Sequence, residues 1–197
     1  MVRVAIDNLG STEPSSALVP RRFSPVRDAK SRRVPVLYAG ADLACALGET
    51  VFHDLPDDVV SPGEVFRADL LTLRAGTVVA NIDVELADLT DAALAGYGYR
   101  RDEVIDTATL EYGVTRLWAQ HAWDTTACAG LVWNSRRSPQ RLSFLLFVDP
   151  RSPADRPRAL NRKKHLSVVS PPMPLYDGNG FSWVMDAAAQ RNVTVIL

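Results

Sequence analysis

An apolar strand that runs directly into a helix, over residues 34–52, constrains the fold more than any other part of this chain. The segment reads VPVLYAGADLACALGETVF, and its β-branched first half predicts a strand over 34–39 that stops at GAD. Asp42 precedes the next apolar run and suits a helix N-cap, so a helix is expected over 43–52. Glu49 would then lie on the flank of the buried face of that helix, near a strand end.

The remaining patterns mix strands and helices and predict the α+β class. We expect a single domain over 1–197, with central mixed or antiparallel sheets, flanking helices and an irregular arm over 1–20 that begins with a short strand in VRVAI. Further strands are expected in TVVANIDVEL, GLVW, RLSFLLFVDP, the edge segment LSVV and the closing VTVIL, with a loop in SPPMPLYDGNG.

Helices are expected in LTDAALAGYG and, as the longest helical stretch, within residues 101–123. On the longer helix Val114, Leu117, Trp118 and His121 share one side. Packing against the core is the simplest interpretation of this stripe.

Composition excludes several classes of function. The 197 residues are 47% hydrophobic and carry a net charge of −1 with a pI near 6.3, which gives little electrostatic support for binding nucleic acid. No apolar stretch has the length of a signal peptide or a membrane span, so a cytoplasmic protein is expected. Cys45 and Cys128 are in no metal-ligand spacing and are expected to be buried free thiols, and the three histidines suggest no metal site.

Three polar side chains stand where an apolar element ends, which is where side chains can reach a pocket. Tyr38 ends the first strand, Glu49 follows on the helix with Cys45 and His53 at four-residue spacing, and Ser135 follows the GLVW strand. Each also has a plain structural interpretation, as a packed ring, a solvated charge and a turn residue. Ser135 lacks the G-x-S-x-G elbow of a hydrolase, and no dinucleotide or phosphate-binding glycine loop is present.

Several blocks of this sequence resemble the RES-domain family, named for an Arg, a Glu and a Ser. They are RRFSP, VPVLYAGADLACALGETVFHD, YGVTRLWAQ, AGLVWNSRR and SFLLFVDP, which span about residues 20–150. The family often has a Gly-Gly-Arg-aromatic motif where this chain has PRRFSP. Arg22, which precedes Phe23, is the best match for the family arginine, and Arg21 and Arg27 remain alternatives.

The resemblance implies a fold similar to the ADP-ribosyltransferase toxins and a cytoplasmic toxin of a toxin–antitoxin pair. The family's chemistry is degradation of NAD, as substrate, by hydrolysis or phosphorolysis of the nicotinamide–ribose bond, without a metal. The implied partner is an antitoxin with a Xre-type helix-turn-helix, with a homodimer as a further option and no direct contact with nucleic acid or membrane. The alternatives are an ADP-ribosyltransferase that modifies a protein and an inactive antitoxin-binding module.

The resemblance also assigns roles to four residues. Arg22 would bind the pyrophosphate, and Tyr38 would stack on the nicotinamide or its ribose. Glu49 would stabilise the positive charge that develops on the ribose. Ser135 would bind the ribose or the nicotinamide amide, or help to position Glu49.

Overall fold

The main sheet is built from strands that come from both halves of the chain. The computed structural model describes residues 1–6, 9–15, 20–55, 62–107, 111–149 and 159–197. Within these residues the strand order is β10-β6-β1-β4-β9-β8-β7, with β11 also paired to β6, and every pairing is antiparallel except that of β7 with β8. The strands are β1 (Val2–Ile6), β4 (Val36–Gly40), β6 (Leu73–Ala80), β7 (Ala87–Leu89), β8 (Gly130–Asn134), β9 (Leu142–Phe147), β10 (Leu166–Val168) and β11 (Met173–Pro174).

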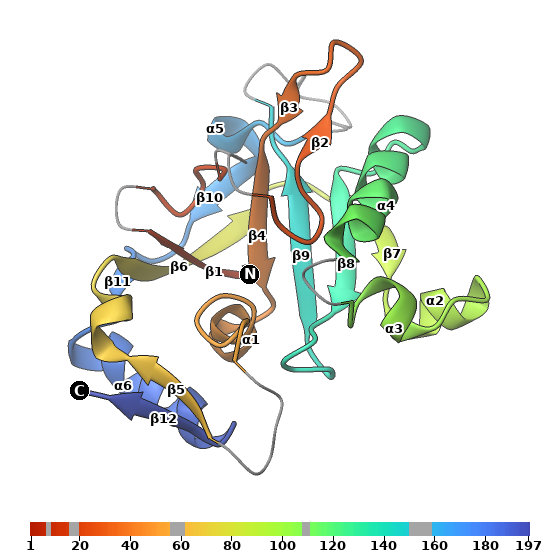
Figure 1. Ribbon diagram of the computed structural model, residues 1–197. Coiled ribbons are helices and arrows are strands. Elements are labelled where there is room, and N and C mark those ends of the chain that lie inside the picture. The colour runs from red at the N-terminus through yellow and green to blue at the C-terminus, as the bar shows by residue number, and fades with distance from the viewer. Residues whose placement is uncertain (7–8, 16–19, 56–61, 108–110, 150–158) are drawn as a thin grey trace.

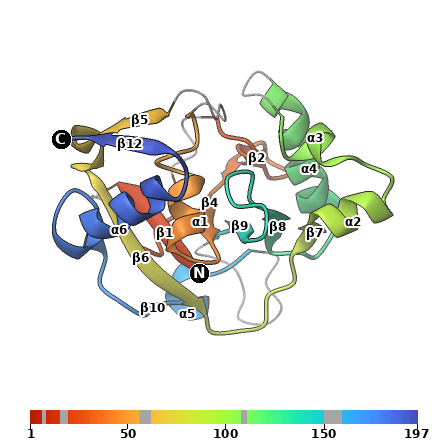
Figure 2. The same ribbon diagram turned by 90° about the horizontal axis from the view of Figure 1, so that it is seen from below.

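Two strand pairs and the helices lie around this sheet (Figure 1). β2 (Val26–Arg27) pairs with β3 (Arg33–Val34), and β5 (Gly63–Phe66) runs parallel to β12 (Val193–Ile196). The helices are α1 (Leu43–Gly48), α2 (Asp91–Gly96), α3 (Arg101–Val104), α4 (Tyr112–Thr125), α5 (Arg162–His165) and α6 (Gly178–Ala189), with a 3-10 turn over Arg67–Leu70. In Figures 1 and 2, α2, α3 and α4 lie on one side of α1. The helix α6 and the strands β5 and β12 lie on its other side.

Alternation along β4 divides the apolar interior into separate clusters. Val36 and Tyr38 face a cluster covered by α2, α3 and α4, whereas Leu37 and Ala39 face a cluster on the opposite side of the sheet. A third cluster joins α1 to α6 and to the β5–β12 pair. The strand at 36–40 is therefore buried on both faces, and its residues border several packing layers at once.

The α+β class and the mixed sheet agree with the sequence prediction, and so do the strand–helix unit after residue 34 and the edge position of β10. The short strand expected in VRVAI is confirmed as β1, and it lies inside the sheet, where it pairs with both β4 and β6. The helix expected over 43–52 ends at Gly48. The strand expected in TVVANIDVEL begins earlier, at Leu73, and ends at Ala80.

The predicted burial of α4 is wrong for most of the stripe that carried it. Val114 and Leu117 are 50% and 67% exposed, and His121 is exposed as well. The buried positions are Tyr112, Thr115, Ala119 and Ala122. Three of these are small side chains, which let the helix approach the sheet closely, while Trp118 is only partly buried against the cluster.

The sequence also gave no prediction of α6. Gly178 and Gly180 made the start of this helix resemble a loop, but a Cβ at Gly180 would lie 1.8 Å from the Pro174 carbonyl oxygen. Glycine is needed there because the first turn of α6 packs against the backbone of β11. Cys45 is a buried free thiol as expected, whereas Cys128 is a partly exposed one.

Candidate functional site

The short helix α1 places Glu49 immediately after its last residue. Asp42 caps the helix, since its side chain accepts a hydrogen bond from the Cys45 amide, and Glu49 is the C-cap. Gly40 lets α1 sit against the end of β4, because a Cβ there would lie 2.6 Å from the Ala46 nitrogen. A carboxylate at this end of a helix faces the partial negative charge of the carbonyls and needs donors from elsewhere.

Those donors come from the loop after β8. The Ser135 hydroxyl donates to Glu49 Oε1 at 2.6 Å, and the Arg136 amide donates to the same oxygen at 3.0 Å. The Ser138 amide donates to Ser135 Oγ at 3.1 Å, so the hydroxyl itself is held in place. Ser135 is fully buried.

Tyr38 uses its hydroxyl to fix the segment that carries the arginine. The hydroxyl accepts from the Phe23 amide at 3.2 Å and donates to Ser24 Oγ at 3.3 Å. Burial raises the pKa of Tyr38 to about 12, so the phenol stays protonated at neutral pH. The ring lies edge-on to Trp133, with 6.4 Å between the ring centroids.

Arg22 is a buried cation whose terminal nitrogens have no partner in the described residues. The residue is 4% exposed, and neither Nη1 nor Nη2 forms a hydrogen bond there. Its guanidinium lies 5.2 Å from the centroid of the Tyr112 ring, and its carbonyl accepts a hydrogen bond from Thr115. A buried, unsatisfied guanidinium is costly, and an anionic ligand is the natural group to satisfy it.

Three of the four predicted residues line one cavity of about 580 Å³. Arg22, Tyr38 and Glu49 border it, and Ser135 lies behind Glu49 and does not. The alternative Arg21 also borders this cavity. Arg27 does not, and its amide instead bonds to the side chain of Gln120 at the surface.

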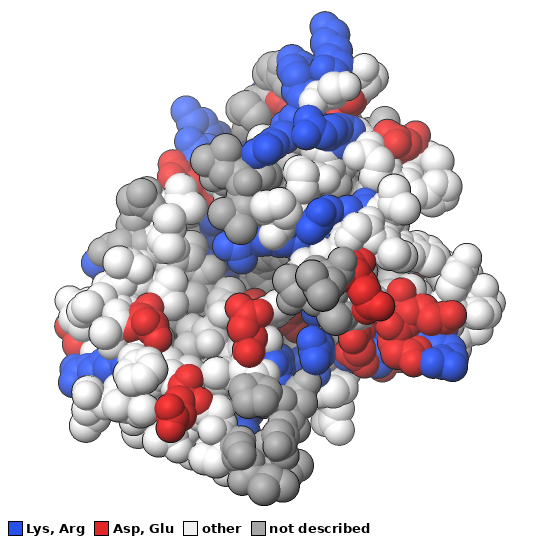
Figure 3. Space-filling view, in the orientation of Figure 1, with Lys and Arg blue, Asp and Glu red and all other residues white. Residues whose placement is uncertain are grey.

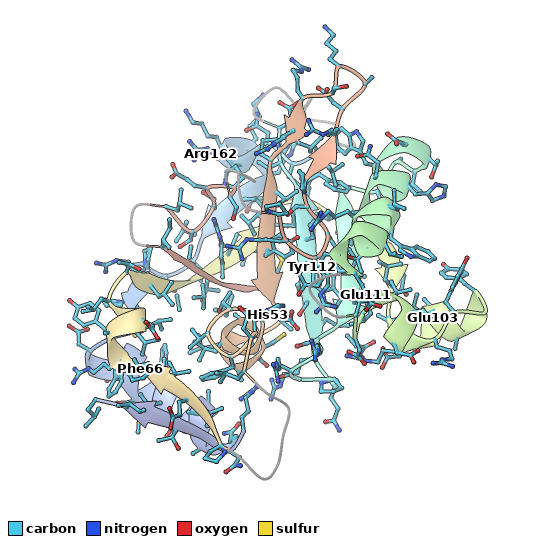
Figure 4. All side chains as sticks on the ribbon, viewed as in Figure 1. His53, Phe66, Glu103, Glu111, Tyr112 and Arg162 are labelled. Carbon is cyan, nitrogen blue, oxygen red and sulfur yellow. The ribbon has the colours of Figure 1, made fainter. Side chains whose placement is uncertain are left out.

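Sequence reasoning missed several residues of the cavity, among them Arg3, His53 and Tyr112. The Tyr112 hydroxyl lies 3.1 Å from His53 Nε2, and Figure 4 shows the two side chains close together. Both His53 and Tyr112 lie in sequence blocks that carry the family resemblance, and His53 also has four-residue spacing from Glu49, whereas Arg3 had no signal. Arg3 sits in β1, donates to the carbonyl oxygens of Gly10 and Ser11, and has a pKa that burial lowers to about 10.

Charge is divided around this face of the molecule. Figure 3 shows arginine and lysine side chains around the hollow in its centre and a group of acidic side chains over α2 and α3.

A second cavity, of about 510 Å³, lies between α1, α6 and β6 with largely apolar walls, and it contains none of the predicted site residues. The described residues include no group of three or more His, Cys, Asp or Glu side chains placed to hold a metal ion.

Comparison with protein-family models shows the family of this chain. The model described as RES domain matches residues 5–168, which include the end of β1 and all four predicted site residues. The chain belongs to the RES-domain family. The match ends at residue 168, so β11, α6 and β12 lie outside the matched residues.

Solved structures support the fold. The chain is similar to a chain in the crystal structure of the M. tuberculosis MbcT–MbcA toxin–antitoxin complex, with a TM-score of 0.57 and 15% identity over 89% of this chain and 85% of that one. The search of curated proteins gives no significant match. No helix in the described residues is long and apolar enough to cross a membrane.

Proposed function

We propose that this RES-domain protein is the toxin of a toxin–antitoxin pair and that it consumes NAD by breaking the nicotinamide–ribose bond. One observation carries the proposal. A buried guanidinium with unsatisfied nitrogens and a carboxylate oriented by two donors border the same cavity. A ligand that has an anionic group and, elsewhere, a centre that becomes cationic during reaction would satisfy both groups.

The arginines provide the anion-binding part of the cavity. Arg22 can offer two parallel N–H donors to a phosphate oxygen pair, and Arg21 adds a second positive charge to the lining. The free-energy cost of desolvating a phosphate is offset here by its attraction to a cation that is already desolvated. We assign the pyrophosphate of NAD to this part of the cavity.

Glu49 provides the charge that the reaction needs. Cleavage of the nicotinamide–ribose bond transfers the bonding electron pair to the nicotinamide nitrogen, which becomes neutral, and leaves positive charge on the ribose. A preoriented carboxylate stabilises that charge as it develops and can accept a hydrogen bond from a ribose hydroxyl. Because Ser135 is buried behind Glu49, we assign it to holding Oε1 and not to binding NAD.

Tyr38 contributes its ring and not its hydroxyl. Both hydrogen bonds of the hydroxyl are used within the protein, and the edge of the Tyr38–Trp133 pair leaves aromatic surface on the cavity wall. Such a wall suits the flat nicotinamide ring. The ribosyl cation is then captured by water or by phosphate, which gives hydrolysis or phosphorolysis.

The test is a time course of NAD with purified protein, with and without phosphate, and with the products identified. We expect wild-type protein to release nicotinamide and Glu49→Gln to be slower by a factor of about 100 to 1,000, because a neutral amide does not stabilise the cation. Glu64→Gln is the matched control, since this exposed residue lies on β5 away from the cavity. NAD loss at the wild-type rate by folded Glu49→Gln would contradict the assigned role.

The same experiment separates the other interpretations. An ADP-ribosyltransferase would leave label from NAD on a protein and produce little free ADP-ribose. An inactive module that only binds an antitoxin would consume no NAD. Either result would replace the proposed reaction.

A further inference from the structure

We propose that Arg101 is a positioning residue for Glu49 and that the candidate site therefore extends into α3. This inference rests on the proposed function, because it describes how the carboxylate of the NAD site is held. Arg101 borders no part of the cavity and belongs to none of the sequence blocks that pointed to the site. Its guanidinium nevertheless contacts the peptide group that donates a hydrogen bond to Glu49.

The guanidinium of Arg101 reaches the end of β8. Its Nη2 donates to the Ser135 carbonyl oxygen at 2.9 Å and lies 3.4 Å from the Asn134 carbonyl oxygen. The Ser135 carbonyl and the Arg136 amide belong to the same peptide unit, which is planar and has its C=O and N–H pointing in opposite directions. Arg101 therefore holds one side of this peptide while the other side donates to Glu49 Oε1 at 3.0 Å.

This arrangement does more than hold the peptide in place. A cation that donates to a carbonyl oxygen polarises the peptide and strengthens the N–H on its other side as a donor, as in hydrogen-bond chains generally. The stronger donor stabilises the ionised carboxylate of Glu49 in one orientation. Ser135 Oγ, attached to the same backbone, supplies the second hydrogen bond to Oε1.

Arg101 is itself fixed by two acidic residues. Its Nη1 donates to both carboxylate oxygens of Asp91, at 2.7 and 3.0 Å, and its Nε donates to Asp106 at 2.8 Å. The side chain is 20% exposed, so these pairs are only partly screened by water. Asp91 is also joined to β8 directly, since its amide donates to the Asn134 side chain. The acidic residues over α2 and α3 thus orient a cation toward the site.

The neighbouring Arg100 offers a matched control. It has the same charge and lies one position away, but its guanidinium pairs with Asp102, its backbone amide donates to Glu103, and its side chain is 76% exposed. Arg101→Met and Arg100→Met each remove one positive charge. Only Arg101→Met also removes the contact with the Ser135 carbonyl oxygen.

The experiment measures kcat and KM for NAD together with thermal unfolding. Arg101→Met should lower kcat by about 10- to 100-fold, the cost of losing one hydrogen bond from a charged group, with KM for NAD nearly unchanged. Arg100→Met should leave both constants unchanged. Arg101→Lys should lie between wild type and Arg101→Met, because an ammonium keeps the charge but not the planar fork. If Arg101→Met does not fold, the Arg101→Lys result decides alone.

A double variant distinguishes positioning from a general loss of structure. Arg101→Met should cost less in a Ser135→Ala background than in wild type, because both changes act on the same carboxylate. Full additivity, or an unchanged kcat in folded Arg101→Met, would overturn the proposal.

A readout without NAD keeps this proposal separate from the proposed function. Hydrogen exchange of the Arg136 amide should be faster in Arg101→Met than in wild type and in Arg100→Met. If wild-type protein consumes no NAD, the proposed reaction fails and this exchange rate still tests the contact. Equal exchange rates in the three proteins would overturn the role of Arg101.

Discussion

Arg22 presents a guanidinium to the cavity from a segment that belongs to no helix and no long strand. Its position depends on three contacts from elsewhere: Thr115 on its carbonyl, Tyr38 on the next amide and Tyr112 beneath its charge. None of these contacts is visible in PRRFSP, which has no periodicity. This is why the sequence left Arg21, Arg22 and Arg27 as alternatives, and why only coordinates place Arg27 outside the cavity.

The arginine assignment gives a prediction at the residue scale. Arg22→Lys should raise KM for NAD by about tenfold and change kcat less, because a lysine cannot offer two parallel donors to a phosphate. Arg27→Lys should leave both constants unchanged, since its contacts are with Gln120 and Ser31 at the surface. Steady-state kinetics of the two variants check this. A larger effect from Arg27→Lys would mean that the arginine has been assigned wrongly.

Glu49 and Ser135 show what a sequence can and cannot indicate about single residues. The strand–helix pattern predicted where Glu49 would emerge, and the end of the GLVW strand predicted a presented polar group at Ser135. The two residues are 86 positions apart in the sequence, and only the folded sheet brings their side chains to 2.6 Å. Arg101 had no signal, because its role depends on a backbone carbonyl.

At the scale of elements, the helix α4 was predicted correctly, but its buried face was predicted wrongly. Large apolar residues predicted the buried face, yet the helix packs through Thr115, Ala119 and Ala122. Close contact with the sheet favours small side chains, and the sequence does not reveal how near the sheet lies. The strand–helix unit at 34–48 was easier to predict because β-branched residues and the N-cap Asp42 agree on a local structure.

The orientation of α4 can be tested by stability. Leu117→Ser should change the free energy of unfolding by no more than about 0.5 kcal/mol, as expected for an exposed position. Ala119→Leu should destabilise the protein by about 1–3 kcal/mol, because it inserts a large side chain into a filled contact with the sheet. Urea unfolding of both variants measures this. The opposite order of effects would indicate that α4 packs through the face predicted from the sequence.

At the scale of the whole molecule, the segment after the family match completes the structure around α1. Val184, Ala187 and Ala188 of α6 are buried in the cluster that contains Leu47 and Phe52. Arg191, just after the helix, donates to the Ala44 carbonyl oxygen at 3.1 Å and to Ser138 Oγ at 2.7 Å. The C-terminal segment therefore supports both the helix before Glu49 and the loop that binds it.

A chain that ends at residue 168 should consequently lose its cooperative unfolding. Burial of a residue such as Val184 contributes about 1.5–3 kcal/mol, and several such residues together approach the total stability of a typical domain. Differential scanning calorimetry should show the transition for the full chain and none at that temperature for the shortened one. Removal of Leu197 alone, which is 87% exposed, should change little. An unchanged transition in the shortened chain would show that α6 is dispensable.

The order of strands in the sheet also has a consequence for synthesis of the protein. β4 is bordered by β1, made first, and by β9, made much later, and the loop that binds Glu49 precedes β9 directly. A ribosome must therefore translate well past residue 147 before the emerging polypeptide can assemble the carboxylate and its donors. Any fragment released earlier, by a stall or by a premature stop codon, leaves the ribosome without a completed cavity.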